Sequence, residues 1–285
     1  MPEESLHARG VFLRPQYLLS DGEIELLVRT FVSLGVQKLR LTGGEPLLRP
    51  GFVELVDRLA RIEGLKDLAL TTNAVLIPRH AKALKQAGLG RVTVSLDSLD
   101  ESVFKQMAGN RGSVQEVLDG IAAAEQAGFE KMKINTVVQR NVNDHTLMDL
   151  VGHFRHSGHT VRLIEFMDVG NVNHWSRDLV VPSAELLKTI HDRWPLKPVA
   201  QQAASDTARR YEFEDGAGEV GFISSITEPF CGDCSRARIT AEGLFYSCLF
   251  SAHGSNLRDK IRAGLNAEEL AAEISALWQK RADRY

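Results

Sequence analysis

Short β-branched runs alternate with stretches of helical spacing through the first two thirds of the chain, and this alternation restricts the possible folds more than any other feature. The runs predicted to be strands are Lys38–Thr42, Asp67–Thr72, Arg91–Asp97, Met132–Val138 and Val161–Met167. They are nearly continuous in apolar residues, as strands are when both faces of a parallel sheet are buried. The alternation therefore predicts a parallel α/β sheet or barrel covered by helices.

Helix boundaries carry signals of their own. Ser20–Glu23 and Ser113–Glu116 have the spacing of capping boxes, which satisfy free N–H groups where helices begin. A glycine, which adopts the left-handed conformation at little cost, follows the predicted helices at Gly35, Gly64, Gly88, Gly128 and Gly158. These signals put the helices between the predicted strands.

The alternation ends after Met167. Beyond it we expect one helix near Ser183–Arg193, β-hairpins at residues 210–224 and 236–249, and an amphipathic helix from Asn266 to Tyr285. The sequence thus predicts two regions, a partial barrel over residues 1–167 and a C-terminal region over residues 168–285.

Composition excludes several classes of protein. The formal net charge of −3 argues against a protein that binds nucleic acid through bulk positive charge. No apolar run reaches the roughly 18 residues of a membrane helix, and the N-terminal residues lack the layout of a secretory signal. Three cysteines are too few for a disulfide scaffold. These features predict a cytoplasmic enzyme with no nucleic-acid or membrane partner.

Polar side chains follow every predicted strand. They lie at Thr42–Glu45, Thr71–Asn73, Ser95–Asp97, Asn135–Thr136 and Glu165. One polar strand end marks only a transition to a loop, but several in succession favour a site at the carboxyl edge, where parallel α/β folds place their chemistry. Gly43 and Gly44 either form a tight turn or let a ligand approach the backbone, and they match no P-loop or dinucleotide motif.

The three cysteines lie close together in the sequence, as Cys231-Gly-Asp-Cys234 and Cys248. A C-x-x-C pair with a returning third thiol is uncommon without a metal, although three buried free thiols remain an alternative. Zinc would need a fourth ligand, for which His253 is the nearest candidate. An iron–sulfur cluster held by three cysteines would leave one iron without a protein ligand.

Basic side chains accompany these features. Arg236 and Arg238 alternate beside the cysteines, so both face one side, and guanidinium groups match the geometry of phosphate. Lys38 and Arg40 alternate along one predicted strand, and Lys133 lies on another. Solvated surface charge is the usual interpretation of such residues, but beside an open metal position they favour an anionic, phosphorylated ligand.

Together these residues resemble the radical S-adenosylmethionine enzymes and, more narrowly, the GTP 3′,8-cyclase family of molybdenum cofactor biosynthesis. The matching segments are Leu39–Pro46, Thr71–Asn73, Val94–Asp100, Asn135–Val137, Phe230–Arg238, Cys248–Phe250 and Asn256–Asp259. They span almost the whole chain, and the cysteine segment is far more specific than the Gly-Gly-Glu-Pro motif that many radical enzymes share. The resemblance implies an incomplete (βα)6 TIM-like barrel that lacks its first strand, followed by a C-terminal β/α region carrying an auxiliary cluster.

The resemblance also implies a reaction with two [4Fe–4S] clusters. One cluster cleaves S-adenosylmethionine to a 5′-deoxyadenosyl radical, which takes a hydrogen from C3′ of GTP. C3′ then bonds to C8 of guanine, giving (8S)-3′,8-cyclo-7,8-dihydroguanosine 5′-triphosphate, while the second cluster holds the guanine through its open iron. A reductant, a homodimer and a downstream cyclic pyranopterin monophosphate synthase are the implied partners.

Position by position, the resemblance implies three sets of contacts and no catalytic side chain. The second cluster would be held by Cys231, Cys234 and Cys248. GTP would be bound by Arg40, Thr71, Lys133, Arg236, Ala237 and Arg238, with Lys38 and Arg162 as additions. S-adenosylmethionine would be bound by Gly44, Ser95 and Met167.

The sequence departs from the family pattern near both ends. The family's radical-forming cluster is held by an N-terminal C-x-x-x-C-x-x-C motif, which these residues do not contain, and a sequence like Met1–Glu4 can directly follow its last cysteine. The family's C-terminal Gly-Gly tail is also missing. We therefore expect the numbering to start just beyond the cluster ligands, and the polypeptide as written to bind GTP without cleaving S-adenosylmethionine.

Two other functions fit part of the pattern. A peptide-maturing radical enzyme with an auxiliary cluster is one alternative, but a peptide has no triphosphate to meet Arg236 and Arg238. A non-catalytic nucleotide-binding or zinc protein is the other, and metal analysis would separate it from both enzymes.

Overall fold

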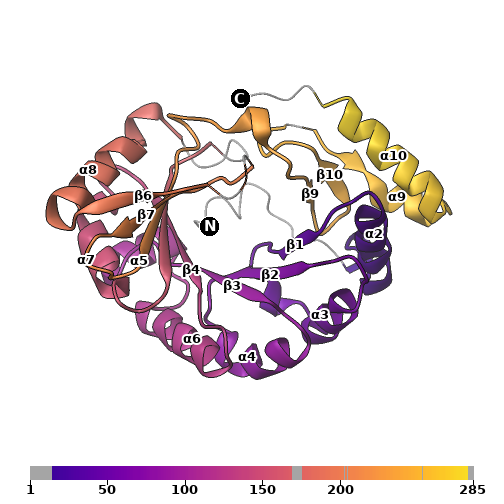
Figure 1. The fold of residues 1–285 in the computed structure, drawn as a ribbon. Coiled ribbons are helices and arrows are strands. Elements are labelled where there is room, and N and C mark those ends of the chain that lie inside the picture. The colour runs from indigo at the N-terminus through magenta and orange to yellow at the C-terminus, as the bar shows by residue number, and fades with distance from the viewer. Residues whose placement is uncertain (1–14, 169–174, 202, 204, 252, 282–285) are drawn as a thin grey trace.

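A curved sheet of eight strands forms the centre of the computed structural model, which describes residues 15–168, 175–201, 203, 205–251 and 253–281. The strands lie in the order β1-β2-β3-β4-β5-β8-β7-β6 (Figure 1). Their bounds are β1 Lys38–Leu41, β2 Asp67–Thr72, β3 Arg91–Ser95, β4 Lys133–Val138, β5 Thr160–Glu165, β6 Leu196–Val199, β7 Arg209–Phe213 and β8 Glu219–Ile223. Strands β1 to β5 and β8 are parallel, and β7 and β6 continue the sheet as antiparallel strands.

Helices cover the outer, convex side of this sheet (Figure 1). They are α2 Asp21–Ser33, α3 Phe52–Ala60, α4 Ile77–Gln86, α5 Glu101–Ala108, α6 Val114–Gln126, α7 Leu147–Phe154 and α8 Ser183–Arg193. Single 3-10 turns are η1 Pro15–Tyr17, η2 Pro46–Leu48, η3 Asp144–Thr146, η4 Arg177–Leu179 and η5 Cys231–Asp233. A second, three-stranded sheet has the order β11-β10-β9, with β9 Arg238–Ile239, β10 Leu244–Tyr246 and β11 Ser255–Asn256. The last two helices, α9 Leu257–Arg262 and α10 Ala267–Gln279, pack instead against β10 of this second sheet and against α2.

The expected parallel α/β fold is confirmed, and each predicted strand is present. The third strand ends at Ser95 and the fifth at Glu165, each two residues before its predicted end. β8 adds another parallel strand beside β5, although its sequence predicted only the second arm of a hairpin. Together with β6, which was not predicted, it carries the sheet across residue 167, where we expected one region to give way to the next.

The C-terminal predictions also correspond to observed elements. The helix Ser183–Arg193 is α8, and the two hairpins are β7–β8 and β9–β10. The final amphipathic helix is α10, with Asn266 as its N-cap. The expectations on Met1–Glu4 and on residues 282–285 concern residues outside those that the structure describes.

Helix caps follow the sequence signals closely. The Ser20 hydroxyl accepts from the N–H of Glu23 at 3.2 Å, and the Glu23 carboxylate accepts from the N–H of Ser20 at 2.7 Å, which completes the capping box. Ser113 supplies half of one, because it accepts from the N–H of Glu116 while its own hydroxyl donates to that side chain. The predicted C-terminal glycines all have positive φ, as a left-handed cap requires.

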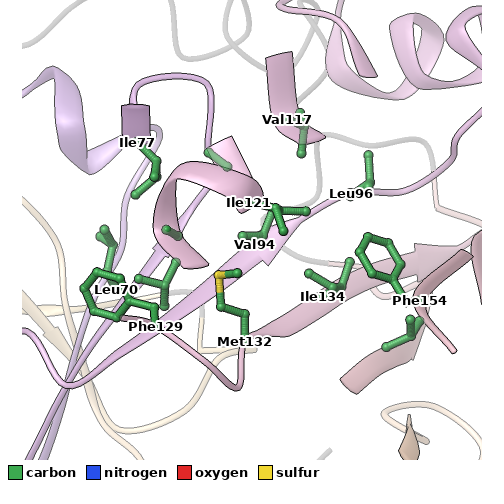
Figure 2. Packing of buried hydrophobic residues seen from close by; sticks show 14 of the residues in the cluster. Leu70, Ile77, Val94, Leu96, Val117, Ile121, Phe129, Met132, Ile134 and Phe154 are labelled. Atoms are coloured by element: carbon green, nitrogen blue, oxygen red, sulfur yellow. The ribbon is translucent and has the colours of Figure 1, made fainter. Parts of the chain in front are cut away.

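The main core lies between the sheet and the outer helices. Val94 of β3 and Ile134 of β4 are fully buried and face Val117 and Ile121 of α6 (Figure 2). Residues of this side alternate along each strand with residues on the opposite, inner face of the sheet. The inner face is therefore free to carry polar groups, and the described strands use it for the site.

A second, smaller core fixes the C-terminal region. Leu27 of α2 packs with Phe245 of β10 and with Leu270 and Ile274 of α10. This cluster holds the three-stranded sheet at the β1 end of the large sheet (Figure 1). The cysteine-bearing segments on either side of β9 and β10 are thereby held near β1.

No helix among the described residues is both long and apolar enough to span a membrane.

The contact between α6 and Ala74 gives a test of this packing. A Cβ atom at Gly120 would lie 2.2 Å from the Ala74 carbonyl oxygen, although alanine inside a helix is otherwise favoured by about 1 kcal/mol over glycine. We expect Gly120→Ala to lower the free energy of unfolding by about 1–3 kcal/mol, as overpacking does. Gly22→Ala in α2, where nothing lies within 4 Å, is the control and should be neutral or stabilising in urea unfolding. Equal stability of the two variants would contradict the close approach.

Candidate functional site

Cationic side chains line the inner face of strands β1 to β5. They are Lys38 and Arg40 on β1, Arg91 on β3, Lys133 on β4 and Arg162 on β5. The strand register puts them on one surface, because Arg40 pairs with Ala69, Ala69 with Arg91, Lys133 with Thr93 and Arg162 with Asn135. Their neighbours along each strand, such as Val92, Ile134 and Leu163, belong to the outer core. Within these strands Asp67 is the one acidic residue on the inner face.

Two of these cations are held by hydrogen bonds. Arg91 makes two hydrogen bonds to the Asp67 carboxylate. Its Nε atom donates to Oδ1 at 2.8 Å, and its Nη2 atom donates to Oδ2. Arg162 donates from Nε to Asn135 Oδ1 at 3.0 Å. A Cβ at Gly221 of β8 would lie 3.4 Å from Arg162 Cγ, so this buried side chain packs alongside the β8 backbone.

Burial and mutual repulsion disfavour the charges on this face. Burial and the charges of Arg162, Arg91 and Arg40 lower the pKa of Lys133 to about 8. Burial and the charge of Arg40 lower the pKa of Arg162 to about 10. The pKa of Arg40 falls through burial and the charges of Arg91 and Arg236. A polyanion bound here would relieve this repulsion, so the face is suited to a phosphorylated ligand.

The Thr71 hydroxyl lies on the same surface. Thr71 pairs in register with Thr93, which pairs with Lys133. Its Oγ1 atom is buried and has no hydrogen-bond partner among the described residues. Buried polar groups almost always have a partner, so this hydroxyl indicates that a ligand group completes the site.

The three cysteines are free thiols on two segments beside the small sheet. Cys231 begins the turn η5, Cys234 directly follows it, and both are half-buried, whereas Cys248 follows β10 and is buried. Arg236 donates from Nη2 to Cys234 Sγ at 3.3 Å, and its guanidinium lies 4.9 Å from the ring of Phe230. Burial would raise the pKa of the Cys234 thiol, but the hydrogen bonds and charge of Arg236 outweigh it and lower the pKa.

Arg238 connects the cysteine segments to the inner face electrostatically. Burial and the charge of Arg236 lower its pKa, while Cys234 and Cys248 act in the opposite direction. Arg40 of β1 also lowers the pKa of Arg238. Arg238 therefore interacts electrostatically with the thiols and with Arg40, because charges in a partly buried site are screened only weakly.

The donor set of the cysteine segments suits a metal cluster. Three free thiols, one with a lowered pKa, are the ligands that iron–sulfur clusters take. No group of three or more His, Cys, Asp or Glu side chains among the described residues is already arranged to hold a metal ion. His253, the nearest candidate for a fourth ligand if the metal were zinc, is exposed, and its carbonyl accepts from Ser251 Oγ at 3.2 Å.

The residues expected to contact S-adenosylmethionine lie at the carboxyl edge of the parallel strands. Gly44 follows β1, Ser95 is the last residue of β3, and Met167 follows β5. A Cβ at Gly43 or Gly44 would meet no atom within 4 Å, so the protein's own packing leaves space beside this loop. That space is what a ligand approaching the backbone needs.

Carboxylates at the strand ends brace the loops around this edge, a role that the sequence did not reveal. Glu45 accepts from Thr72 Oγ1 and from the N–H of Asn73, both at 2.9 Å. Glu165 accepts from the N–H groups of Ser183 and Ile226, both at 2.8 Å. Two of the polar strand ends predicted as site residues therefore hold the loops in position.

Two charged residues of the inner face were missed from the sequence. Asp67 and Arg91 begin predicted strands and lie on the same face as residues that were identified. A charged residue inside an otherwise apolar strand is the signal that could have found both. Their partners could not be read from one chain segment, because the hydrogen bonds join different strands.

Two family profiles match the chain. One is described as the Radical SAM superfamily and matches residues 7–154, and the other is described as Molybdenum Cofactor Synthesis C and matches residues 159–285. The two together cover nearly the whole chain, and the second covers the cysteine segments.

Curated relatives that share the name GTP 3′,8-cyclase match over almost the full chain. A protein of Xanthomonas campestris pv. campestris (strain B100) named GTP 3′,8-cyclase is 54% identical over 267 residues, which cover 94% of this chain and 78% of that protein. Proteins of the same name from Acidothermus cellulolyticus and Staphylococcus carnosus are 43% and 40% identical, each over 100% of this chain and over 80% and 84% of their own lengths.

Solved structures share the fold at low identity. Streptococcus suis SuiB bound to S-adenosylmethionine has a TM-score of 0.60 at 15% identity, over 90% of this chain and 60% of that one. The enzyme anSMEcpe with bound AdoMet has a TM-score of 0.56 at 18% identity, over 88% of this chain and 71% of that one. These likenesses support the TIM-like arrangement of the parallel strands.

Proposed function

The chain belongs to the GTP 3′,8-cyclase family of radical S-adenosylmethionine enzymes, which acts in molybdenum cofactor biosynthesis, and from this we propose how it binds its substrate. GTP lies with its triphosphate on the cationic inner face of β1 to β5 and its guanine toward the cysteine segments. The observation that carries the proposal is the group of cations that strand register collects on this inner face, and the charges of Arg40 and of the thiols both affect the pKa of Arg238.

The triphosphate meets side chains from separate strands. Arg40 and Lys133 make no ion pair within the described residues, so their charges are available to phosphate oxygens. Charge-assisted hydrogen bonds from guanidinium and ammonium groups are the strongest that proteins make to phosphate. Thr71 supplies its unpartnered hydroxyl, and Arg162, held by Asn135, adds charge behind it.

The guanine end is bound by the cysteine segments. Cys231, Cys234 and Cys248 hold a [4Fe–4S] cluster, which supplies an iron without a protein ligand for a nitrogen or oxygen of the base. Arg236 and Arg238 flank this position, with the Ala237 backbone exposed between them. Stacking of Arg236 on Phe230 and its bond to Cys234 hold the turn in shape.

S-adenosylmethionine is assigned to Gly44, Ser95 and Met167 at the carboxyl edge of the sheet. The cofactor and a reducing [4Fe–4S] cluster supply the radical that opens the reaction in this family. The cysteines of these 285 residues are all assigned to the substrate cluster. The role of these residues is therefore to bind and orient the substrate.

The wider setting follows from the family and the composition. We infer a cytoplasmic homodimer that takes electrons from a reductant and passes its product to a cyclic pyranopterin monophosphate synthase. A cationic inner face favours a triphosphate over a peptide, which separates this proposal from peptide maturation.

Metal analysis tests the cluster. Anaerobic reconstitution with iron and sulfide should give about four irons per chain, with the absorbance of a [4Fe–4S] cluster, because three thiolates form one ligand set. Cys248→Ser should lose most of the bound iron. His253→Ala is the control and should keep it. Stable zinc binding that depends on His253, with no iron uptake, would contradict the proposal.

Calorimetry tests the nucleotide site. Charge-assisted bonds contribute roughly 1.5–3 kcal/mol each, so Arg236→Ala or Arg238→Ala should weaken GTP binding about tenfold or more. Arg61→Ala removes an arginine from the surface of α3, where it pairs with Asp57, and should leave the affinity unchanged. Unchanged affinity in both site variants would show that the nucleotide binds elsewhere.

A further inference from the structure

Asp67 stands out on the inner face because it is surrounded by positive charge. Lys38 of β1 is paired with Asp67 in strand register, and Arg91 of β3 donates two hydrogen bonds to its carboxylate. Burial would raise the pKa of Asp67, but Arg91, Lys38 and Lys133 together outweigh burial and lower it. The carboxylate is therefore an anion within a group of cations, and it lies in the part of the molecule proposed to bind a polyanion.

An anion in a polyanion site weakens binding directly, so its presence requires a compensating effect. The charge of Asp67 acts against the burial and repulsion that disfavour the charges of Arg40 and Lys133. The Asp67 carboxylate also accepts hydrogen bonds from both Nε and Nη2 of Arg91, whereas Arg40 and Lys133 make no ion pair among the described residues. Removing Asp67 would leave like charges facing one another with no acidic residue of these strands on the inner face.

We propose that Asp67 is a positioning residue for the substrate. Held by Arg91, it supplies the counter-charge that keeps Lys133 protonated and Arg40 in place before the triphosphate arrives. The inference rests on the proposed function, because it assumes that these cations receive phosphate. It adds an acidic residue, and its arginine partner, to a site otherwise built from basic ones.

The role of Asp67 can be measured through the protonation of Lys133. The charged groups that act on it come from every neighbouring strand of the face, namely Arg40 on β1, Asp67 on β2, Arg91 on β3 and Arg162 on β5. Its pKa of about 8 lies in an accessible pH range. GTP binds the protonated form, so affinity is full below this pKa and declines as the pH rises through it.

The two partners of the ion pair should shift this decline in opposite directions. Asp67→Asn removes an attractive charge and lowers the pKa of Lys133, whereas Arg91→Gln removes a repulsive charge and raises it. A single charge on the same face shifts the pKa of Lys133 by about one unit. Between pH 6.5 and 8.5 the affinity for GTP should then fall about fourfold in the wild type, about 20-fold or more in Asp67→Asn, and less than about twofold in Arg91→Gln.

The experiment is calorimetric titration of the reconstituted full chain with GTP, and separately with inorganic tripolyphosphate, at several pH values. At pH 6.5 Asp67→Asn should bind GTP at least as well as the wild type, because the direct repulsion between Asp67 and phosphate is gone. Asp67→Glu keeps the charge and should restore the wild-type profile. The matched control is Asp215→Asn, which should behave as wild type. Asp215 lies in the turn between β7 and β8, and this substitution breaks its ion pair with Arg155.

The outcomes separate the two levels of the account. If the variants bind GTP with the same pH profile as the wild type, or weaken it by the same factor at every pH, Asp67 is only structural and the inference is wrong. If the wild type binds neither GTP nor tripolyphosphate, the proposed function fails, and the inference fails with it. Opposite shifts in Asp67→Asn and Arg91→Gln support the inference.

Discussion

Repulsion among cations gathered on one face of a parallel sheet is the constraint to which the rest of the site responds. Strand register brings Arg40, Arg91, Lys133 and Arg162 together, and burial lowers the pKa of Lys133 and Arg162. A folded chain keeps such a group only with counter-charges and hydrogen bonds. Asp67 and Asn135 provide part of this compensation, and a bound polyanion would provide the rest.

The outer packing makes this arrangement possible. Alternate residues of each strand bury apolar side chains against the helices, so the register of the inner face is fixed by the outer core. Carboxylates at the strand ends, such as Glu45 and Glu165, then hold the loops at the carboxyl edge. The smaller core around Leu27 and Phe245 holds the cysteine segments near β1. There the cysteine thiols and Arg40 both affect the pKa of Arg238.

Local signals predicted most of the fold. The β-branched runs, the Ser20 cap and the helix Ser183–Arg193 were all readable, because each depends on residues close together in the sequence. The placement of β8 beside β5 was not, because the choice of partner strand depends on the whole sheet. An eight-stranded sheet that continues past residue 167 follows from that choice.

The site divides in the same way. Residues in the motifs were assigned by family resemblance, Arg40 because it alternates with Lys38 along one strand, and Lys133 because charged side chains are rare inside apolar strands. Asp67 and Arg91 were missed, and the hydrogen bond from Arg162 to Asn135 was not predicted, because these contacts join different strands. The bracing role of Glu45 escaped for the same reason, since its partners are Thr72 and Asn73 on the next strand end.

A spectroscopic titration tests most directly whether one nucleotide bridges the strand cations and the cysteine segments. The measurement is the EPR spectrum of the reduced, reconstituted cluster, recorded with GTP and with inorganic tripolyphosphate at concentrations where calorimetry detects binding. If the guanine lies at the cluster and the phosphates at the strands, GTP changes the spectrum and tripolyphosphate binds without changing it. Bound GTP that leaves the spectrum unchanged would contradict a single site shared by the two parts.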